Sequence, residues 1–354
     1  SGSIVVGIMY PPEWFGSPQD FEAELARIEA VDPRIEVVVT TYVEPHELRS
    51  ARGAAVRGTA GRNEHIEGPP ISAEARVTLG RIHVALAIDL PPDITAIAPD
   101  LAWVQAVGAG TAHLQTTGLA DAGITLTSNG GSNSVGIAEF VFGRLLESVK
   151  RFPAIAASQS EHRWESLYGE QLSGQTIGLI GFGAINQAVA ARAHAFGMRV
   201  LVMRRSAEAP VDGHVDRVYG PDGLHEMLGQ CRAVIAAVPE TPETVDMMDA
   251  AAFASMRSGT FFANVGRGTL VDEPALIASL ESGHVGSAAL DVTTIEPLPP
   301  DNPLWDAPNL RISGHCSTSP AALIPNLHRV FRENLERFVR GEPLTNQVST
   351  ERGY

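Results

Sequence analysis

The sequence contains almost no lysine: Lys150 is the only one among 354 residues. A phosphate-binding loop of the GxxxxGK[ST] type needs a lysine directly after its glycines, and Lys150 follows no such run. A lysine Schiff base could form only at this position, on the flank of a predicted helix. Phosphate-loop, kinase-like and pyridoxal-phosphate chemistry are therefore poor interpretations.

Cysteine, basic charge and long apolar runs are also scarce. Two cysteines, Cys231 and Cys316, cannot build a disulfide framework, which indicates a reducing compartment and by default the cytoplasm. The net charge of −15 would repel a nucleic-acid backbone. Residues 171–191 carry no charge, but polar side chains and four glycines interrupt them, so we expect no membrane span.

The run GLIGFGAINQAVA has the shape of a dinucleotide-binding turn, because it follows a predicted strand and opens a predicted helix. Gly181 permits the tight turn, and Gly183 permits close approach of the backbone to a pyrophosphate. The N–H groups of Ala184 and Ile185 would point at that anion. Asn186 replaces the third glycine and is expected to push the helix slightly outward. A glycine turn without a ligand is the alternative that this motif alone leaves open.

Arg204, Arg205 and Ser206 stand at the end of the next predicted strand, RVLVM. An acid at this position, about twenty residues after the glycines, would accept hydrogen bonds from the adenosine ribose. Two guanidinium groups and a hydroxyl suit a 2′-phosphate instead, so NADP(H) is predicted in preference to NAD(H). Solvated surface arginines are the alternative interpretation.

The length and the apolar pattern indicate two α/β domains, since a single core rarely grows beyond about 250 residues. From Thr176 onward, strand and helix patterns alternate as in a doubly wound parallel sheet. We predict a Rossmann dinucleotide-binding domain over 131–318, inserted into a flavodoxin-like α/β substrate domain formed by residues 1–130 and 319–354. Residues 49–76, rich in glycine and arginine, are expected to form a long surface loop.

Three further segments carry chemical groups: ANVGRGTLVDEPALIASL, ALDVTTIEPLPPDNPLW and NLRISGHCSTSP. In this order and together with the glycine turn, they resemble the D-isomer-specific 2-hydroxyacid dehydrogenases, and the resemblance covers the chain from about Leu101 onward. It implies that Arg267 holds the carboxylate and carbonyl of the substrate. It also implies that Glu296 supports the base and that His315 exchanges the proton.

The chemistry of the three side chains agrees with these roles. An arginine fork matches a planar carboxylate, and a histidine can protonate a carbonyl oxygen as hydride arrives at C2. Each residue has a structural alternative: a loop cap, a turn acid, or a satisfied histidine at a strand end. Cys316 is discounted as a nucleophile because adjacent side chains of an extended segment point to opposite faces.

The resemblance implies further contacts as well. The loop VGAG would offer the main-chain N–H groups of Ala109 and Gly110 to the substrate carboxylate, and Asp291 would contact the nicotinamide carboxamide. The other cofactor-binding positions that it implies are Pro239, Thr244 and Val265.

These inferences predict an oxidoreductase that uses NADPH to reduce a small 2-oxo acid to a D-2-hydroxy acid, in the cleft between the domains. Glyoxylate and hydroxypyruvate are the substrates expected by analogy. We expect a homodimer, as is the habit of the family, and no metal, membrane or nucleic-acid partner. A nucleotide-sensing binding protein on the same fold is an alternative. An S-adenosylmethionine methyltransferase with a similar turn is disfavoured by the segments containing Glu296 and His315.

The cofactor preference can be tested by replacing Arg204 with aspartate. Loss of one charge-assisted contact should lower the catalytic efficiency with NADPH about tenfold to a hundredfold. The new carboxylate should favour NADH, because it can accept hydrogen bonds from the ribose hydroxyls. The measurement is kcat/KM with each cofactor, and a wild-type enzyme that uses NADH as well as NADPH would contradict the assignment.

Overall fold

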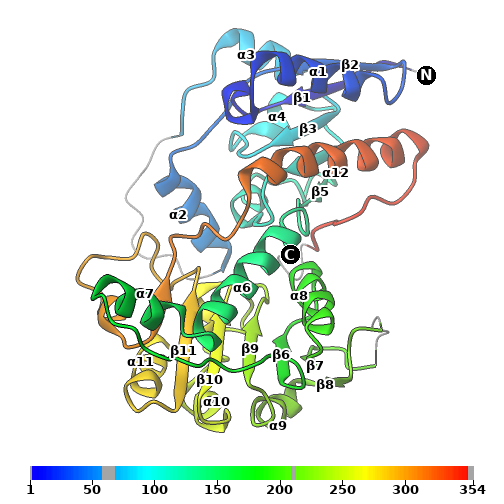
Figure 1. The fold of residues 1–354 in the computed structure, drawn as a ribbon. Helices are drawn as coiled ribbons and strands as arrows, with labels where there is room; N and C mark the ends of the chain where they lie inside the picture. The colour runs from blue at the N-terminus through cyan, green and yellow to red at the C-terminus, as the bar shows by residue number, and fades with distance from the viewer. Residues whose placement is uncertain (1, 58–67, 209–212, 350–354) are drawn as a thin grey trace. The chain divides into compact units, whose positions relative to one another are not determined.

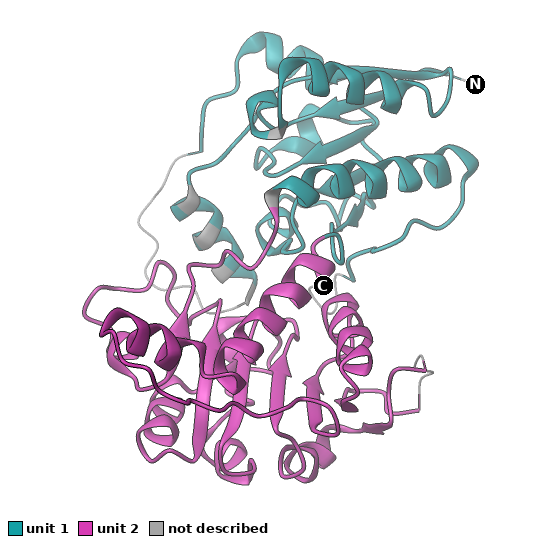
Figure 2. Cartoon of the chain, in the orientation of Figure 1, with its two compact units in different colours: residues 1–132, 321–354 teal, residues 133–320 magenta. Residues whose placement is uncertain are grey.

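The computed structural model describes residues 2–57, 68–208 and 213–349. The chain forms two compact units (Figure 2). Unit 1 contains residues 1–132 and 321–354, and unit 2 contains residues 133–320. Unit 2 is thus a continuous stretch of sequence, whereas unit 1 is assembled from both ends of the chain.

Unit 2 is built on a parallel sheet in which the strand order reverses beside its first strand (Figure 1). The order is β12-β11-β10-β9-β6-β7-β8, and the neighbouring strands pair in parallel. A ligand site is expected where the order reverses, outside the carboxyl ends of β6 and β9. The strands are β6 (Thr176–Ile180), β7 (Arg199–Met203), β8 (Arg217–Tyr219), β9 (Ala233–Ala236), β10 (Thr260–Asn264), β11 (Val285–Leu290) and β12 (Leu310–Ile312).

Helices cover both faces of this sheet, and each face has its own apolar core. One core includes buried side chains of α9, α10 and α11, and the other includes those of α6 and α8. The strands read as continuous apolar runs because both of their faces are buried. The helices are α6 (Ser134–Val149), α7 (Phe152–Ser160), α8 (Ala184–Ala195), α9 (Leu224–Leu228), α10 (Ala250–Ser255) and α11 (Glu273–Glu281).

Unit 1 has a second parallel sheet, with the strand order β2-β1-β3-β4-β5. This is the order of flavodoxin-like folds. Both predicted folds are therefore confirmed. The strands are β1 (Ile4–Ile8), β2 (Ile35–Val39), β3 (Val84–Ala87), β4 (Trp103–Ala106) and β5 (Thr125–Thr127); the helices are α1 (Pro18–Glu29), α2 (His46–Arg57), α3 (Ala73–Leu79), α4 (Ile94–Ile97), α5 (Ala112–Gln115) and α12 (Pro320–Arg340).

The C-terminal helix α12 completes the core of unit 1. Its Leu327, Phe331 and Leu335 are fully buried in the same apolar cluster as side chains of β1, β3 and β4. Phe331 stacks on Trp103 of β4 with ring centroids 5.2 Å apart. No helix among the described residues combines the length and apolar character needed to span a membrane.

The predicted surface loop over residues 49–76 is wrong over 49–57 and 73–76, which are helical. Residues up to 57 belong to α2, and α3 begins at Ala73; residues 58–67 lie outside the described part of the chain. Arginine side chains tie α2 to buried carboxylates, through the pairs Arg49–Asp89 and Arg52–Glu44. Apolar periodicity could not reveal a helix that is held mainly by charge.

Candidate active site

The glycine turn joins β6 to α8 as predicted. Gly181 has a φ of 84°, and a Cβ there would lie 2.5 Å from Val238 Cγ1, so both its conformation and its surroundings require glycine. A Cβ on Gly183 would meet nothing within 4 Å. The backbone is therefore open at Gly183, directly before the N-terminal N–H groups of Ala184 and Ile185. This cradle fits a pyrophosphate.

Asn186 is fully buried at the position where a third glycine was expected. Its Nδ2 donates to the carbonyl oxygens of Ile180 at 2.9 Å and Gly181 at 2.8 Å. The asparagine thus bonds α8 directly to the end of β6. The turn is closed by these two hydrogen bonds where the usual motif relies on close helix–strand packing.

The residues that follow β7 are cationic. Arg204 is half-buried, and its main-chain N–H donates to Tyr219 O at 3.0 Å. Arg205 and Ser206 are exposed. A hydrogen bond from Thr241 lowers the pKa of Glu243, and the charge of Arg205 adds to this effect. Arg205 therefore lies within electrostatic reach of the loop that follows β9, where two further cofactor-binding positions were predicted.

Those positions, Pro239 and Thr244, belong to one turn. Thr244 Oγ1 donates to Pro239 O at 2.8 Å and accepts the N–H of Thr241, also at 2.8 Å. Val265, the third position, is buried at the end of β10, where its N–H donates to Ala236 O at 3.0 Å. All three lie beyond the carboxyl ends of β9, which is next to β6 in the sheet, and of β10, which is next to β9.

Arg267 lies in the tight loop after β10. The loop crosses so close to the chain at Thr293 that a Cβ on Gly268 would lie 2.0 Å from its main chain. Buried Asn264 holds the loop by donating Nδ2 to Arg267 O at 2.8 Å. Arg267 Nη1 donates to Gly266 O at 2.7 Å within the same loop, and the side chain of Asp272 caps α11, the helix that follows.

Glu296 and His315 are joined by a side-chain hydrogen bond. His315 Nδ1 lies 2.9 Å from Glu296 Oε2, and Glu296 Oε1 accepts the N–H of Thr293 at 3.1 Å. The His315 side chain is 53% exposed and the Glu296 side chain 35%, so both can be reached by a small molecule. Because Glu296 engages Nδ1, Nε2 is the ring nitrogen left for proton exchange with a substrate.

The two groups shift each other's pKa. The hydrogen bond to Glu296 raises the pKa of His315, against partial burial and the charge of Arg267. Partial burial alone would raise the pKa of Glu296, but the hydrogen bonds from His315 and the Thr293 N–H lower it below its usual value. The charge of Arg267 acts on both groups. The structure therefore brings Arg267, Glu296 and His315 into one electrostatic unit.

Asp291 organises the loop that carries His315. It is 2% exposed and accepts hydrogen bonds from the Ser313 hydroxyl at 2.6 Å, from the Cys316 N–H at 2.9 Å, and from both the N–H and the hydroxyl of Ser317. Its carbonyl oxygen accepts the His315 N–H at 2.9 Å. Sequence reasoning missed this anchoring role and both serines; the serines that flank the histidine in SGHCS were the available signal.

Cys316 was discounted as a nucleophile on the expectation that residues 315 and 316 lie in an extended segment. That expectation is wrong, although the thiol does not pair with His315. The segment is not extended, because His315 has a φ of 53°. The imidazole hydrogen-bonds Glu296, while the main chain of Cys316 is tied to Asp291. The described residues contain no group of three or more His, Cys, Asp or Glu side chains suited to a metal ion.

Ala109 and Gly110 lie in unit 1, in the exposed loop between β4 and α5.

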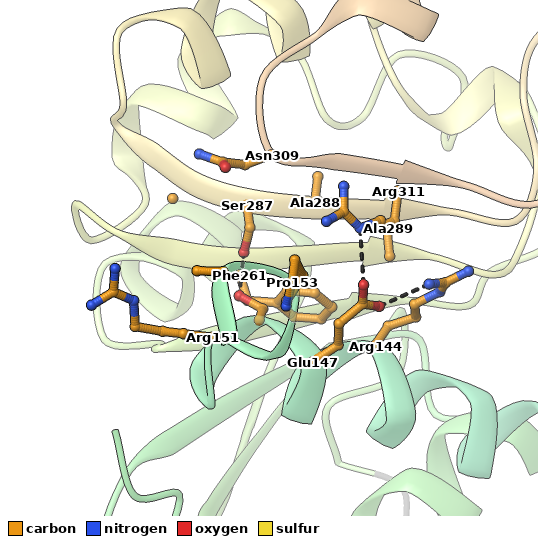
Figure 3. A pocket seen from close by; sticks show the side chains of 13 residues that line it. Arg144, Glu147, Arg151, Pro153, Phe261, Ser287, Ala288, Ala289, Asn309 and Arg311 are labelled. Atoms are coloured by element: carbon orange, nitrogen blue, oxygen red, sulfur yellow. Dashed lines mark hydrogen bonds and ion pairs between the residues drawn. The ribbon is translucent and has the colours of Figure 1, made fainter. Parts of the chain in front are cut away.

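A cavity of about 300 Å³ lies in unit 2, between α6, α7 and the strands β10 to β12 (Figure 3). Glu147 there pairs with Arg144 at 2.8 Å and Arg311 at 2.9 Å. The predicted site residues are not among those that line this cavity.

Comparison with known proteins agrees with the geometry. The model of the family "D-isomer specific 2-hydroxyacid dehydrogenase, NAD binding domain" matches residues 142–317. A glyoxylate reductase of Korarchaeum cryptofilum is 29% identical over 311 residues, which cover 83% of this chain and 93% of that protein. A D-3-phosphoglycerate dehydrogenase of Archaeoglobus fulgidus is 29% identical over 264 residues, 73% of this chain. The chain spans about half the length of the phosphoglycerate dehydrogenases that it matches.

Two crystal structures resemble the whole chain. One is a D-isomer specific 2-hydroxyacid dehydrogenase of Xanthobacter autotrophicus in complex with NADPH and MES, with a TM-score of 0.75, 27% identity and complete coverage of both chains. The other is an NADPH-dependent glyoxylate/hydroxypyruvate reductase of Sinorhizobium meliloti in complex with NADP and sulfate, with a TM-score of 0.73, 27% identity and complete coverage of both chains.

The doubly wound sheet, the glycine turn and the match to an NAD-binding domain define a nicotinamide-dinucleotide-binding protein of the α/β class. More particularly, the chain belongs to the D-isomer-specific 2-hydroxyacid dehydrogenase family.

The hydrogen bond between Glu296 and His315 predicts how kcat/KM for reduction depends on pH. If His315 donates the proton in reduction, kcat/KM for reduction should fall as pH rises through the raised pKa of His315. Glu296→Gln removes the charge that raises this pKa, and the falling limb should move to lower pH with reduced activity at neutral pH. His315→Ala, the control, should lower the rate about a hundredfold or more at every pH because the proton donor is gone. An unmoved limb in Glu296→Gln would show that Glu296 is not the functional partner.

Proposed function

We propose that this protein reduces a small 2-oxo acid to the D-2-hydroxy acid with a reduced nicotinamide cofactor. The observation that carries the proposal is the electrostatic unit of Arg267, Glu296 and His315 in a chain of this family. A bound reduced nicotinamide supplies a hydride for C2 of the oxo acid. The chain's own residues bind the acid and provide the proton.

Each of the three side chains has a distinct part in the reaction. Arg267 binds the carboxylate and the carbonyl oxygen of the acid with its planar fork, which fixes C2 in place. His315 gives its Nε2 proton to the carbonyl oxygen as negative charge develops there. Glu296 keeps the ring oriented through Nδ1 and favours the protonated form before the reaction.

We propose NADP(H) as the preferred cofactor. Arg204, Arg205 and Ser206 supply two cations and a hydroxyl, and no acid, at the end of β7. The similar structures from Xanthobacter autotrophicus and Sinorhizobium meliloti are complexes with NADPH and NADP. Both observations support the preference.

The remaining assignments extend the same proposal. Glyoxylate or hydroxypyruvate is the proposed substrate, by analogy with the reductases of Korarchaeum cryptofilum and Sinorhizobium meliloti. The remaining site residues proposed are Ala109 and Gly110 for the substrate carboxylate, Asp291 for the nicotinamide carboxamide, and Gly181, Gly183, Ala184, Ile185, Pro239, Thr244 and Val265 for the dinucleotide.

Turnover separates the enzyme from a nucleotide-sensing protein on the same fold. NADPH oxidation should be measured with a panel of 2-oxo acids and with Arg267→Ala and Arg267→Lys. We expect the alanine variant to lose kcat/KM by about a hundredfold or more, since a charged contact is removed. The lysine variant should retain part of the activity, because the charge remains without the bidentate fork. Tight NADPH binding without turnover on any acid would favour the sensor.

We also propose a homodimer, formed through the segment from α7 to β6. Four large apolar side chains in this segment are exposed: Phe152 by 53%, Ile155 by 42%, Tyr168 by 83% and Trp164 completely. Exposed apolar surface marks protein–protein contacts, and aromatic side chains dominate the binding energy of such contacts. The cavity of Figure 3 adjoins the same segment through Pro153 and Ala154.

Replacement of Trp164 and Tyr168 with serine should weaken this dimer and give monomers at micromolar concentration. Light scattering during size-exclusion chromatography measures the mass. Trp14→Ser, at an aromatic residue 46% exposed in unit 1, should leave the mass unchanged. A monomeric wild-type protein would contradict the proposal.

We further propose a cytoplasmic location, which the two unpaired cysteines, Cys231 and Cys316, support. Titration of both thiols in unfolded protein from its native source checks this.

A further inference from the structure

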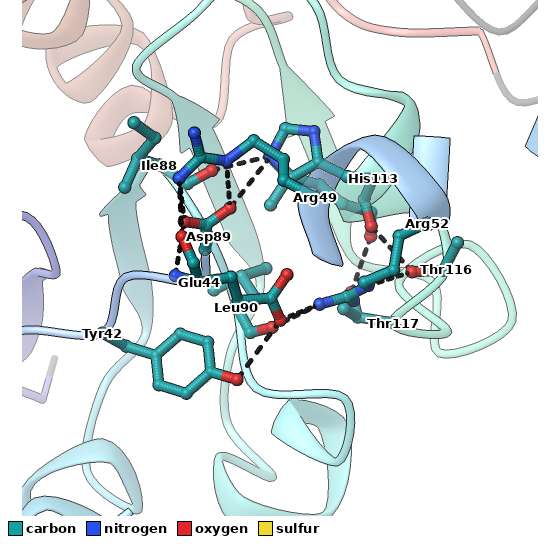
Figure 4. Close-up of polar contacts among 11 residues, drawn as sticks. Tyr42, Glu44, Arg49, Arg52, Ile88, Asp89, Leu90, His113, Thr116 and Thr117 are labelled. Atoms are coloured by element: carbon teal, nitrogen blue, oxygen red, sulfur yellow. Dashed lines mark hydrogen bonds and ion pairs between the residues drawn. The ribbon is translucent and has the colours of Figure 1, made fainter. Parts of the chain in front are cut away.

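Four charged side chains of unit 1 form a network that the proposed chemistry does not use (Figure 4). Asp89, after β3, and Glu44, before α2, have fully buried side chains. Arg49 of α2 donates Nε and Nη2 to the two oxygens of Asp89, at 2.8 and 2.6 Å. Arg52, one turn further along α2, pairs with Glu44 through Nη1. Each buried charge thus has a partner of opposite sign.

The same network ties α2 to α5. Arg52 Nε donates to Thr116 Oγ1 at 2.7 Å, and Arg52 Nη1 donates to Leu90 O at 3.2 Å. His113 Nε2 lies 2.8 Å from Ile88 O and 3.5 Å from Asp89 Oδ1. Because His113 is part of α5 and Thr116 ends it, the arginines hold α5 against the end of β3.

Helix α5 is the downstream anchor of the loop 107–111. The upstream end of this loop is fixed by the sheet, since the Val107 N–H donates to Ala87 O at 2.9 Å. Asn129 adds two hydrogen bonds, from its Nδ2 to Val107 O and from its N–H to Gly108 O, both at 3.0 Å. Thr111 is buried where α5 begins, and the three residues before it are exposed. The exposed N–H groups of the loop are therefore placed by the sheet at one end and by the arginine-bound helix at the other.

We propose that Arg49 and Arg52 are positioning residues, which hold the loop 107–111 in the form that binds the substrate carboxylate. This inference rests on the proposed function, in which Ala109 and Gly110 supply the N–H groups. Buried ion pairs suit such a task because removal of one partner leaves an uncompensated charge, so alternative placements of α2 and α5 are costly. Substrate affinity should then depend on side chains that do not touch the substrate.

The test compares Arg52→Gln with Arg81→Gln in the full chain. Arg81 is the matched control, because it pairs with Glu36 on the same unit at 2.8 Å but with both side chains about half exposed. For Arg52→Gln we expect KM for the 2-oxo acid to rise about tenfold, as for loss of one charge-assisted contact, with kcat and NADPH affinity nearly unchanged. Amide hydrogen exchange over residues 103–115 should become faster in this variant and stay as in wild type in Arg81→Gln.

Two further variants distinguish the proposed effect on the loop 107–111 from a general loss of folding. Arg52→Lys keeps the charge near Glu44 but loses the fork that reaches Thr116, so its KM should lie between those of wild type and Arg52→Gln. The double variant Glu44→Gln/Arg52→Gln removes both charges of this one pair, so no unpaired charge is left. It should therefore recover folding stability, whereas KM should stay raised. A stability loss without any change in KM would overturn the inference and show that the network is only structural.

The exchange measurement also separates this inference from the proposed function. If wild type reduces no 2-oxo acid, the proposed function fails, and exchange over 103–115 still decides whether the arginines hold the loop. Unchanged exchange in Arg52→Gln would overturn the inference whatever the enzyme's activity.

Discussion

The candidate site depends on one buried carboxylate. Asp291 receives four hydrogen-bond donors from residues 313–317, and its own carbonyl oxygen fixes the His315 backbone. A carboxylate removed from water needs such partners, because each missing donor would leave a costly unsatisfied charge. The loop is therefore held in one conformation, with His315 in the left-handed region that few non-glycine residues adopt. In this conformation the imidazole meets Glu296.

The other loops of the site are fixed by close backbone contact. Gly268 has no room for a side chain against Thr293, and the same Thr293 donates its N–H to Glu296. Thr293 thus joins the loop that carries Arg267 to the loop that carries Glu296, although Thr293 itself has no part in the proposed chemistry. Charge and packing act on the same three side chains, since Arg267 influences the pKa values of both Glu296 and His315.

The features that could be predicted from the sequence are those with local signals. The two glycines Gly181 and Gly183 predict the turn, and the apolar runs predict the strands of the sheet. The segments around Arg267, Glu296 and His315 carry the resemblance to the dehydrogenase family. The Asp291 network was missed because its donors lie more than twenty residues away along the chain. Helix α2 was missed because buried ion pairs hold it, and charged side chains give no apolar period. The left-handed backbone at His315 could not be predicted, because histidine adopts this region more often than most non-glycine residues but still uncommonly.

The return of α12 to unit 1 has a consequence for the order of folding on the ribosome. Unit 2 is continuous, so its sheet can close once residue 320 has emerged. The sheet of unit 1 must wait longer, because Leu327, Phe331 and Leu335 cover Trp103 and the strands beside it. Until then an apolar face made early in synthesis stays open to water, during the time in which nearly two hundred residues are added. Chains that pause before α12 therefore expose that face, which makes this interval the one most open to aggregation and to chaperone binding.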